Sequence, residues 1–301
     1  MKKTTFLSLK ERQEKDWGKW STYWKLLVEC SRPSPNDLNS IGKIINKHIS
    51  NTPNPVIVIL GSTPEYRDLC MAYALQYKAR VICVELVKDM YLAMTDLLFS
   101  HNNKEEVIFS NWLEMDLPDN SADIVLGDLT EGNIAGEFKA KYLLEIKRIL
   151  KNNGKYITRQ TAYIDKVKAN PIINQTDIEN ILEKYKQEVL SGKLTLRQVG
   201  NYLGAKMALE SYYKMKGKKI SPSVYNKEID RISKIVKSDP IKIEIIKIMK
   251  IVWGPIMDKF WEYYTLDKTI DNFSKHFKNI KYYYSKDYPI AKYTPIFEMQ
   301  K

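Results

Sequence analysis

The chain has 301 residues, enough for one large domain or one and a half, and it can bury a continuous core. Hydrophobic residues make up 44% and charged residues 28% of it, and no uncharged apolar run approaches the ~20 residues of a membrane span, which excludes collagen, coiled coil, wholesale disorder and a transmembrane protein. The N-terminus has no signal-peptide core, and Cys30, Cys70 and Cys83 are too few and too scattered for a disulfide framework or a zinc site. We expect a cytoplasmic protein without a bound metal or a membrane partner.

The charge is unevenly distributed along the chain. The chain has 48 Lys and Arg and 36 Asp and Glu, a net charge of +12. Residues 161–301 hold 26 of these basic residues and 16 of the acidic ones, so this half carries +10 of the net charge. A basic half can favour an anionic substrate, a nucleic acid or a membrane surface. However, lysine dominates the cations in a chain also rich in Ile, Asn and Tyr, so compositional drift explains the excess as well.

The first half of the chain predicts helices followed by alternating strands and helices. Apolar spacing predicts one helix within residues 9–30 and a second from a cap at Asn36 or Asp37 to about Ser50. A helix over 137–151 is expected to stop at Asn152-Asn153-Gly154, where Asn-Gly supplies a left-handed cap. Buried strands are predicted at 56–60, 81–84, 107–109, 124–126 and 155–158. This regular alternation predicts a doubly wound, Rossmann-like α/β sheet.

The second half interrupts this alternation with a helical segment. Four helices are predicted, at about 176–190, 195–215, 223–237 and 241–252. A last helix over 255–278 and an antiparallel pair, 280–284 with 291–299, would complete a seven-stranded sheet. We therefore expect an N-terminal helical cap (1–51), a Rossmann-like cofactor-binding core (52–169), a helical insertion that caps the substrate (170–254), and the last helix and closing hairpin of the core (255–301).

Residues suited to binding follow each predicted strand. In open α/β sheets ligands bind at the carboxyl ends of the strands. The turn Gly61-Ser62-Thr63-Pro64 leads into a helix whose first N–H groups can bind an anionic group, and Glu85 could accept both hydroxyls of a ribose. Asn111-Trp112 pairs an amide with a flat ring that suits a purine, and Gly127-Asp128 follows the fourth strand. The order of these residues predicts a nucleotide-type cofactor.

Taken together, these motifs resemble the class I S-adenosylmethionine-dependent methyltransferases. Leu60 to Glu65 resembles the glycine-rich first motif, Asp123 to Asp128 the fourth-strand motif, and Leu144 to Gly154 the helix and turn before the fifth strand. The resemblance covers about residues 52–163 and 255–301. It implies S-adenosylmethionine as the cofactor, with Glu85 on the ribose and Asn111-Trp112 on the adenine.

The chain departs from the family pattern where the methionine end would bind. Ile59 stands where the family usually has an acidic residue, and Thr63 and Glu65 stand where it has glycines. Arg67, or an aromatic residue of the N-terminal helix (Tyr23, Trp20 or Trp24), is a candidate for binding the methionyl carboxylate. The cofactor-binding residues expected are Gly61, Ser62, Thr63, Pro64, Arg67, Glu85, Leu86, Asn111, Trp112, Gly127, Asp128 and Tyr23.

The sequence names no general base. Asp128 and Tyr163 are candidates for a catalytic role, although Asp128 could equally hold the cofactor's amino group. Arg159 and Tyr163 follow the fifth strand and could line an acceptor pocket. Four tyrosines of the insertion could line it as well: Tyr202, Tyr212, Tyr213 and Tyr225.

The fourth-strand motif, Gly127-Asp128-Leu129-Thr130, differs from the Pro-Pro-Tyr of amino-methylating nucleic-acid enzymes, and no cysteine follows a proline. These features favour methyl transfer to a nitrogen or oxygen of a small molecule or peptide side chain. Three alternatives stay open: an RNA methyltransferase that uses the basic half, cyclisation or cleavage of S-adenosylmethionine, and a non-catalytic methyltransferase-like subunit. The oligomeric state stays open too.

Overall fold

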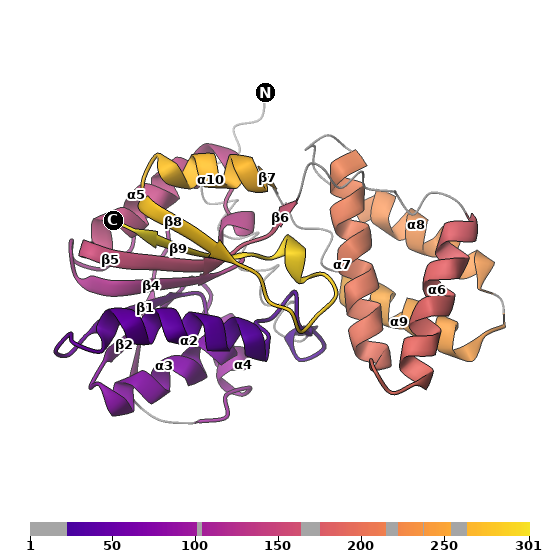
Figure 1. Ribbon diagram of the computed structural model, residues 1–301, viewed down its shortest axis with the longest axis horizontal. Helices are drawn as coiled ribbons and strands as arrows, with labels where there is room; N and C mark the ends of the chain where they lie inside the picture. The colour runs from indigo at the N-terminus through magenta and orange to yellow at the C-terminus, as the bar shows by residue number, and fades with distance from the viewer. Residues whose placement is uncertain (1–22, 101–103, 164–174, 215–221, 237, 254–263) are drawn as a thin grey trace.

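The computed structural model describes residues 23–100, 104–163, 175–214, 222–236, 238–253 and 264–301. Its centre is a seven-stranded sheet of order β3-β2-β1-β4-β5-β9-β8, in which the first five strands are parallel and β9 is antiparallel to both neighbours (Figure 1). The strands are β1 (Val56–Leu60), β2 (Arg80–Glu85), β3 (Glu105–Phe109), β4 (Ala122–Asp128), β5 (Leu150–Arg159), β8 (Lys278–Tyr283) and β9 (Ile296–Gln300). The predicted Rossmann-like sheet with an antiparallel C-terminal pair is confirmed.

Helices cover both faces of the sheet (Figure 1). Ile57 and Ile59 of β1 are fully buried in the cluster that α2 and α3 form, while Val58 and Leu60 lie in the cluster of α5 and α10 on the opposite face. Successive residues of a strand point to opposite faces, so a continuous apolar run such as 56–60 suits a strand covered on both sides. The covering helices are α2 (Pro35–Ile49), α3 (Pro64–Gln76), α5 (Lys139–Ile149) and α10 (Leu266–Ser274).

Several predicted boundaries need correction. Most of the helix predicted within 9–30 lies outside the described residues, and residues 25–30 are not helical. The strand predicted over 291–299 is β9, which begins at Ile296 after a 3-10 turn. The N-cap of α2 is Ser34, with Asp37 as its reciprocal partner in a capping box, whereas Asn36 and Asp37 were the predicted caps. Helix α5 ends at Ile149 and β5 begins at once, and Asn153 rather than Gly154 adopts a positive φ of 68°. The helix predicted over 255–278 is only α10 in the described part, preceded by the short strand β7 (Tyr264–Thr265).

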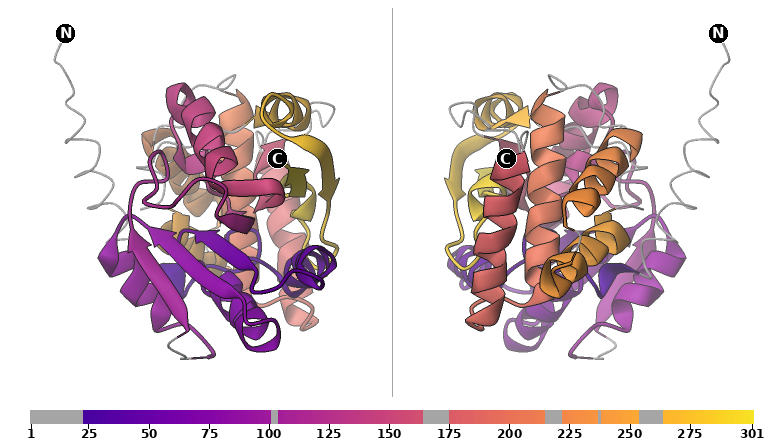
Figure 2. Two further views of the ribbon diagram at one scale, coloured as in Figure 1. Left: turned by 90° about the vertical axis from the view of Figure 1, so that its left-hand side faces the viewer. Right: turned by 90° about the vertical axis from the view of Figure 1, so that its right-hand side faces the viewer.

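The helical insertion forms a separate bundle beside the sheet (Figures 1 and 2). Its helices are α6 (Gln175–Leu190), α7 (Leu196–Lys214), α8 (Pro222–Ile235) and α9 (Pro240–Trp253), close to the four predicted ranges. The short strand β6 (Ala162–Tyr163) precedes the insertion and pairs in parallel with β7, which follows it, so the two connections lie together. No helix within the described ranges is long and apolar enough to cross a membrane.

Candidate active site

The turn after β1 depends on Gly61. Its φ of +86° lies in the left-handed region, and a β-carbon there would sit 3.3 Å from Cζ2 of Trp112. The Gly61 N–H donates to the carbonyl oxygen of Val84 (2.8 Å), which joins the turn to β2. Thr63 is the N-cap of α3, and Pro64 occupies its first turn. The predicted tight turn at the start of a helix therefore forms, with an aromatic ring against its glycine.

Glu85 ends β2 beside this turn, and its side chain is buried. One carboxylate oxygen, Oε1, accepts from the backbone N–H groups of Leu86 (2.7 Å) and Val87 (3.1 Å), and the other accepts from the Ser62 hydroxyl (3.1 Å). These bonds hold the carboxylate against the Gly61 turn. A carboxylate offers about four acceptor positions, so it can also accept from ribose hydroxyls.

Asn111 and Trp112 follow β3 on the same edge of the sheet. Asn111 Oδ1 accepts from the Leu113 N–H (3.0 Å), which closes an Asx turn, and the indole Nε1 of Trp112 donates to Val84 O (2.9 Å). The Trp112 ring lies 6.4 Å from the Tyr142 ring of α5. The structure thus brings Gly61, Glu85 and Trp112 together, as the order of the motifs predicted.

Of the four residues suggested for the methionyl carboxylate, Trp20 lies outside the described residues. Trp24 is buried, and its indole Nε1 has no hydrogen-bond partner within the described ranges. The guanidinium of Arg67 is buried in a bidentate pair with Glu105 of β3 (2.8 to 3.0 Å), donates to Thr95 (2.9 Å) and stacks on Tyr91 at 4.4 Å. Arg67 therefore ties α3 to β3 and to α4 (Lys88–Thr95), while its Nη1 is buried without a hydrogen-bond partner within the described ranges. Tyr23 is partly exposed, and none of the described residues forms a hydrogen bond with its hydroxyl.

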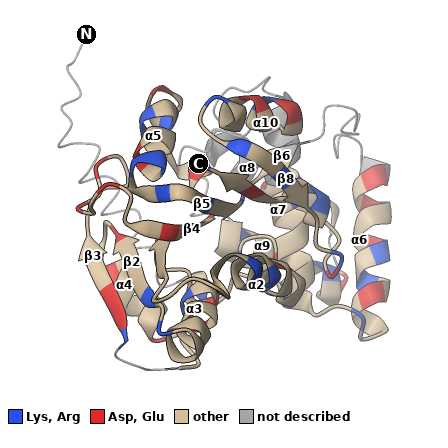
Figure 3. Cartoon of the chain, turned by 60° about the vertical axis from the view of Figure 1, so that its left-hand side comes forward, with Lys and Arg blue, Asp and Glu red and all other residues tan. Residues whose placement is uncertain are grey.

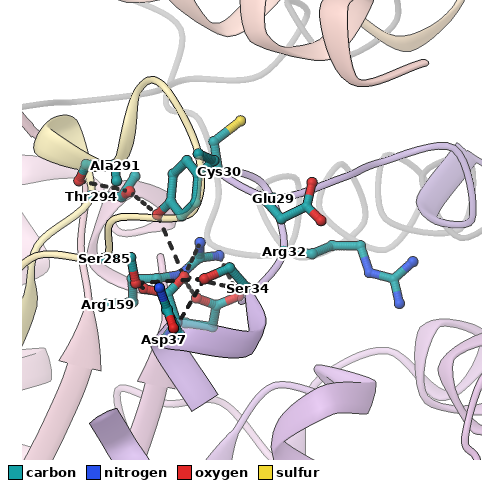
Figure 4. Close-up of polar contacts among 12 residues, drawn as sticks. Glu29, Cys30, Arg32, Ser34, Asp37, Arg159, Ser285, Ala291 and Thr294 are labelled. Atoms are coloured by element: carbon teal, nitrogen blue, oxygen red, sulfur yellow. Dashed lines mark hydrogen bonds and ion pairs between the residues drawn. The ribbon is translucent and has the colours of Figure 1, made fainter. Parts of the chain in front are cut away.

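Asp128, at the end of β4, is buried in an ion-pair cluster. Its carboxylate accepts from Arg159 Nε (2.7 Å) and Nη2 (3.2 Å), and Arg159 Nη1 lies 3.4 Å from Asp37 of α2. Asp37 also accepts from Ser285, which comes from the segment between β8 and β9 (Figure 4). Burial raises the pKa of Asp128 to about 6, while Arg159 opposes the rise.

This arrangement makes Asp128 a structural partner of Arg159, and its catalytic role stays a prediction. Arg159 was expected to line an acceptor pocket, and this role also stays a prediction. Its side chain has no exposed surface in the structure. Tyr163 lies in β6, but its side chain is outside the described part of the chain.

Gly127 makes room for a cluster of hydroxyl groups. A β-carbon there would lie 2.7 Å from Thr130 Oγ1 and 3.1 Å from Tyr156 OH. The Tyr142 hydroxyl donates to Thr130 Oγ1 (2.7 Å) and lies 3.0 Å from the Tyr156 hydroxyl. The predicted importance of Gly127 thus has a local structural reason.

Glu131 follows this cluster, in the short 3-10 helix η1 (Glu131–Asn133), and it was not among the residues predicted for the site. It is 2% exposed, its Oε1 has no hydrogen-bond partner within the described ranges, and burial raises its pKa to about 7 against the opposing charge of Lys139. A glutamate in an irregular segment after a strand carries no pattern that marks it as buried, so only the structure could find it.

The described residues fit a polar ligand at the carboxyl edge of the sheet. Nine buried side-chain N or O atoms in the described part lack a hydrogen-bond partner, and five of them follow the ends of β1, β3, β4 and β5. Buried polar groups are normally paired, so their concentration here indicates groups that a ligand or water would satisfy. These five atoms are Glu65 Oε2, Tyr66 OH, Ser110 Oγ, Glu131 Oε1 and Gln160 Oε1. Glu65 is four residues after Gly61 and Ser110 directly precedes Asn111, so the edge suits the nucleoside and amino acid groups of S-adenosylmethionine.

The insertion is attached to the segment that precedes α2. Arg197 of α7 donates to the carbonyls of Leu26 (3.1 Å) and Leu27 (2.9 Å), and the hydroxyl of Tyr202 donates to Glu29 Oε2 (3.1 Å). Tyr202 is 1% exposed, so it does not line an open pocket in this structure. Tyr212, Tyr213 and Tyr225 have side chains outside the description. No cluster of His, Cys, Asp or Glu among the described residues could hold a metal ion.

Comparison with known proteins finds a matching domain in the middle of the chain. Residues 67–158 match the model of a methyltransferase domain, while a comparison with curated protein sequences finds no match. The chain resembles a Rhodobacter sphaeroides protein assigned to the Zn-dependent alcohol dehydrogenases (13% identity, 95% of this chain and 98% of that chain, TM-score 0.52). It also resembles the Burkholderia thailandensis 1,6-didemethyltoxoflavin-N1-methyltransferase (11% identity, 97% of this chain and 87% of that chain, TM-score 0.49). A third similar structure is human N-acetylserotonin methyltransferase (10% identity, 100% of this chain and 60% of that chain, TM-score 0.47).

At these identities the structural likenesses concern the fold. The domain match covers the segment that supplies β2 to β5 of the sheet, with the binding residues after β2 and β3. On that match, residues 67–158 belong to a methyltransferase domain, which is set in a sheet of the order β3-β2-β1-β4-β5-β9-β8.

Proposed function

We propose that the protein transfers the methyl group of S-adenosylmethionine to a nitrogen or oxygen atom of a small molecule or a peptide side chain. The observation that carries the proposal is the shared hydrophobic core of the insertion and the carboxyl edge of the sheet. Val199 of α7 and Met249 of α9 are buried in one cluster with Leu27, with Met94 of α4 and with Ile290. A bundle in this position suits an acceptor that is small enough to be enclosed.

S-adenosylmethionine supplies a methyl group already activated by the sulfonium, so the protein's task is to align the acceptor and exclude water. Glu131 suits the removal of a proton from an acceptor, since a base works best when its pKa lies near the working pH. Its buried carboxylate lies just after β4, on the edge that carries the cofactor residues.

The first test is calorimetric titration with S-adenosylmethionine and with S-adenosylhomocysteine. We expect binding with a Kd on the order of micromolar, weakened about tenfold or more in Glu85→Ala, because the variant loses the carboxylate that faces the ribose. Glu106→Ala is the matched control: Glu106 ends no strand, lies half exposed on β3 and pairs with Arg80 at 2.7 Å. It should bind as the unmodified protein does.

Acceptors are then screened in extracts by mass spectrometry for gain of one methyl group. Breakdown of S-adenosylmethionine without an acceptor would favour cyclisation or cleavage instead. Absence of binding by the folded protein would favour the non-catalytic alternative.

The cysteines support a reducing compartment, and we propose the cytoplasm. Cys30, Cys70 and Cys83 are all buried and unpaired, and burial raises the pKa of the Cys30 thiol to about 12, which keeps it protonated and unreactive.

A further inference from the structure

The residues described so far suit the adenosine half of the proposed cofactor, and its amino acid end needs partners of its own. Ile59 offers no acidic group before Gly61, and Arg67 is bound to Glu105. The α-ammonium and α-carboxylate of a methionyl group need an acceptor and a donor of opposite charge. Any such pair must lie next to the Gly61 turn.

One ion pair beside this turn is incomplete. Arg32 Nε donates to Glu65 Oε1 at 2.6 Å, and Arg32 Nη2 pairs with the same oxygen. The other oxygen, Oε2, is buried without a hydrogen-bond partner in the part of the chain that the structure describes. Glu65 is in the first turn of α3, four residues after Gly61. A carboxylate that pairs through one oxygen and buries the other is suited to accept a further cationic donor.

The segment that presents Arg32 is held in a strained conformation. Cys30 has φ of 83°, a left-handed conformation that costs a residue other than glycine about 1 to 2 kcal/mol. The N–H groups of Ser31 (3.1 Å) and Arg32 (3.0 Å) both donate to Val28 O and close the turn. In Figure 4 the Arg32 side chain points away from the cluster around Asp37. Strain of this kind persists where the surrounding structure enforces it, often at ligand clamps.

Two neighbouring ion pairs hold more carboxylates than guanidinium groups. Arg32 pairs with Glu65 alone, whereas Arg159 pairs with both Asp128 and Asp37. Glu65 also interacts with Asp128 and with the buried, unpartnered hydroxyl of Tyr66, so these groups lie within range of one another. A ligand with an ammonium group would restore the balance.

We propose that Arg32 and Glu65 form the binding site for the amino acid end of the cofactor, with Glu65 Oε2 accepting from the α-ammonium and Arg32 binding the α-carboxylate. The inference rests on the proposed use of S-adenosylmethionine and assigns two residues that the sequence pattern did not indicate. Glu65 occupies a position at which the family has glycine, so its side chain is a feature of this chain.

The test compares two ligands that share the adenosine half. S-adenosylhomocysteine carries the amino acid end, whereas 5′-methylthioadenosine stops at the sulfur. By calorimetry, Glu65→Gln should weaken binding of S-adenosylhomocysteine about tenfold or more and leave 5′-methylthioadenosine within about twofold, because only the former contacts the lost charge. Arg32→Gln should show the same selectivity. Glu106→Gln, in the exposed pair with Arg80, is the matched control.

Equal losses for both ligands would mean that the pair only supports the fold, and unchanged affinities would mean that it does not touch the ligand; either overturns the inference. Should Glu65→Gln not fold, Glu65→Asp keeps the charge, shortens its reach and allows the same comparison. If the unmodified, folded protein binds neither ligand, the proposed function itself fails, which is a distinct outcome.

Discussion

At the scale of single residues, the site is marked by ionisable groups that are buried at the strand ends. Burial raises the pKa of Glu131 to about 7, above the usual value of a glutamate in an unfolded chain. Between pH 4.5 and 7 the folded protein therefore holds a proton that the unfolded chain has released. Folding stability from this group is present below pH 4.5 and is lost as the pH rises through 7.

We therefore expect Glu131→Gln to be more stable than the unmodified protein at pH 8, by about 2 kcal/mol, and nearly equal to it at pH 5. Glutamine resembles the protonated acid and removes the cost of the buried charge. Urea unfolding at both pH values measures the difference. Glu137→Gln, an exposed site in the neighbouring 3-10 helix η2 (Gly136–Phe138), should change stability little at either pH. An equal effect of Glu131→Gln at pH 5 and pH 8 would contradict the assignment.

The sequence predicted the positions of those site residues that are fixed by the path of the backbone. Gly61 and Glu85 follow buried strands, so the strand pattern brought them to the correct edge. Arg67 and Arg32 have long side chains whose direction no local pattern specifies, and the structure pairs Arg67 with Glu105 and Arg32 with Glu65. Residue type and spacing predict backbone positions better than side-chain partners.

At the scale of elements, periodic segments were predicted well and irregular ones poorly. The helices of the insertion follow the expected ranges closely, since each has an apolar stripe at helical spacing. The start of β5 was misplaced because Asn153 takes the left-handed conformation inside the strand, where a helix end was expected. Residues 254–263 lie outside the description, so only part of the last predicted helix can be compared.

The packing of α7 on α9 depends on a glycine that helical propensity alone would disfavour. A β-carbon on Gly200 would lie 2.5 Å from Cγ2 of Ile248 and 3.3 Å from Ile245 O. We expect Gly200→Ala to destabilise the protein by about 1 to 3 kcal/mol despite the better helix propensity of alanine. Thermal and urea unfolding measure this loss.

A second substitution separates crowding from other causes. Ile248→Ala removes the crowded methyl groups, so the double variant should lose less than the sum of the two single variants. If the stability losses of the two single variants simply add in the double variant, crowding between residue 200 and Ile248 is not the cause of the loss.

At the scale of the whole molecule, the insertion shares a hydrophobic cluster with Leu27, Met94 and Ile290 and carries much of the basic charge. Many of its cations are paired across helices: Lys186 with Asp239 (2.7 Å), and Lys250 with Asp230 (2.9 Å). Figure 3 shows both signs of charge along α6. Paired charges of mixed sign create a weaker field than a one-sided basic face, so the excess of lysine in the sequence overstates the attraction to nucleic acid.

This pairing leads to a prediction about transfer RNA. A methyltransferase that recognises RNA through its basic half would release many counterions, and its affinity would fall steeply with salt. Because several of the described lysines of the insertion are paired with carboxylates, we expect only weak binding at 0.15 M salt, with a Kd above ~10 µM, and a slope of log K against log salt shallower than about −3. Filter binding between 0.05 and 0.3 M salt measures both quantities. Tight binding at 0.15 M with a slope near −6 would instead mean that several phosphates are contacted, and the enclosed-acceptor function would then give way to RNA methylation.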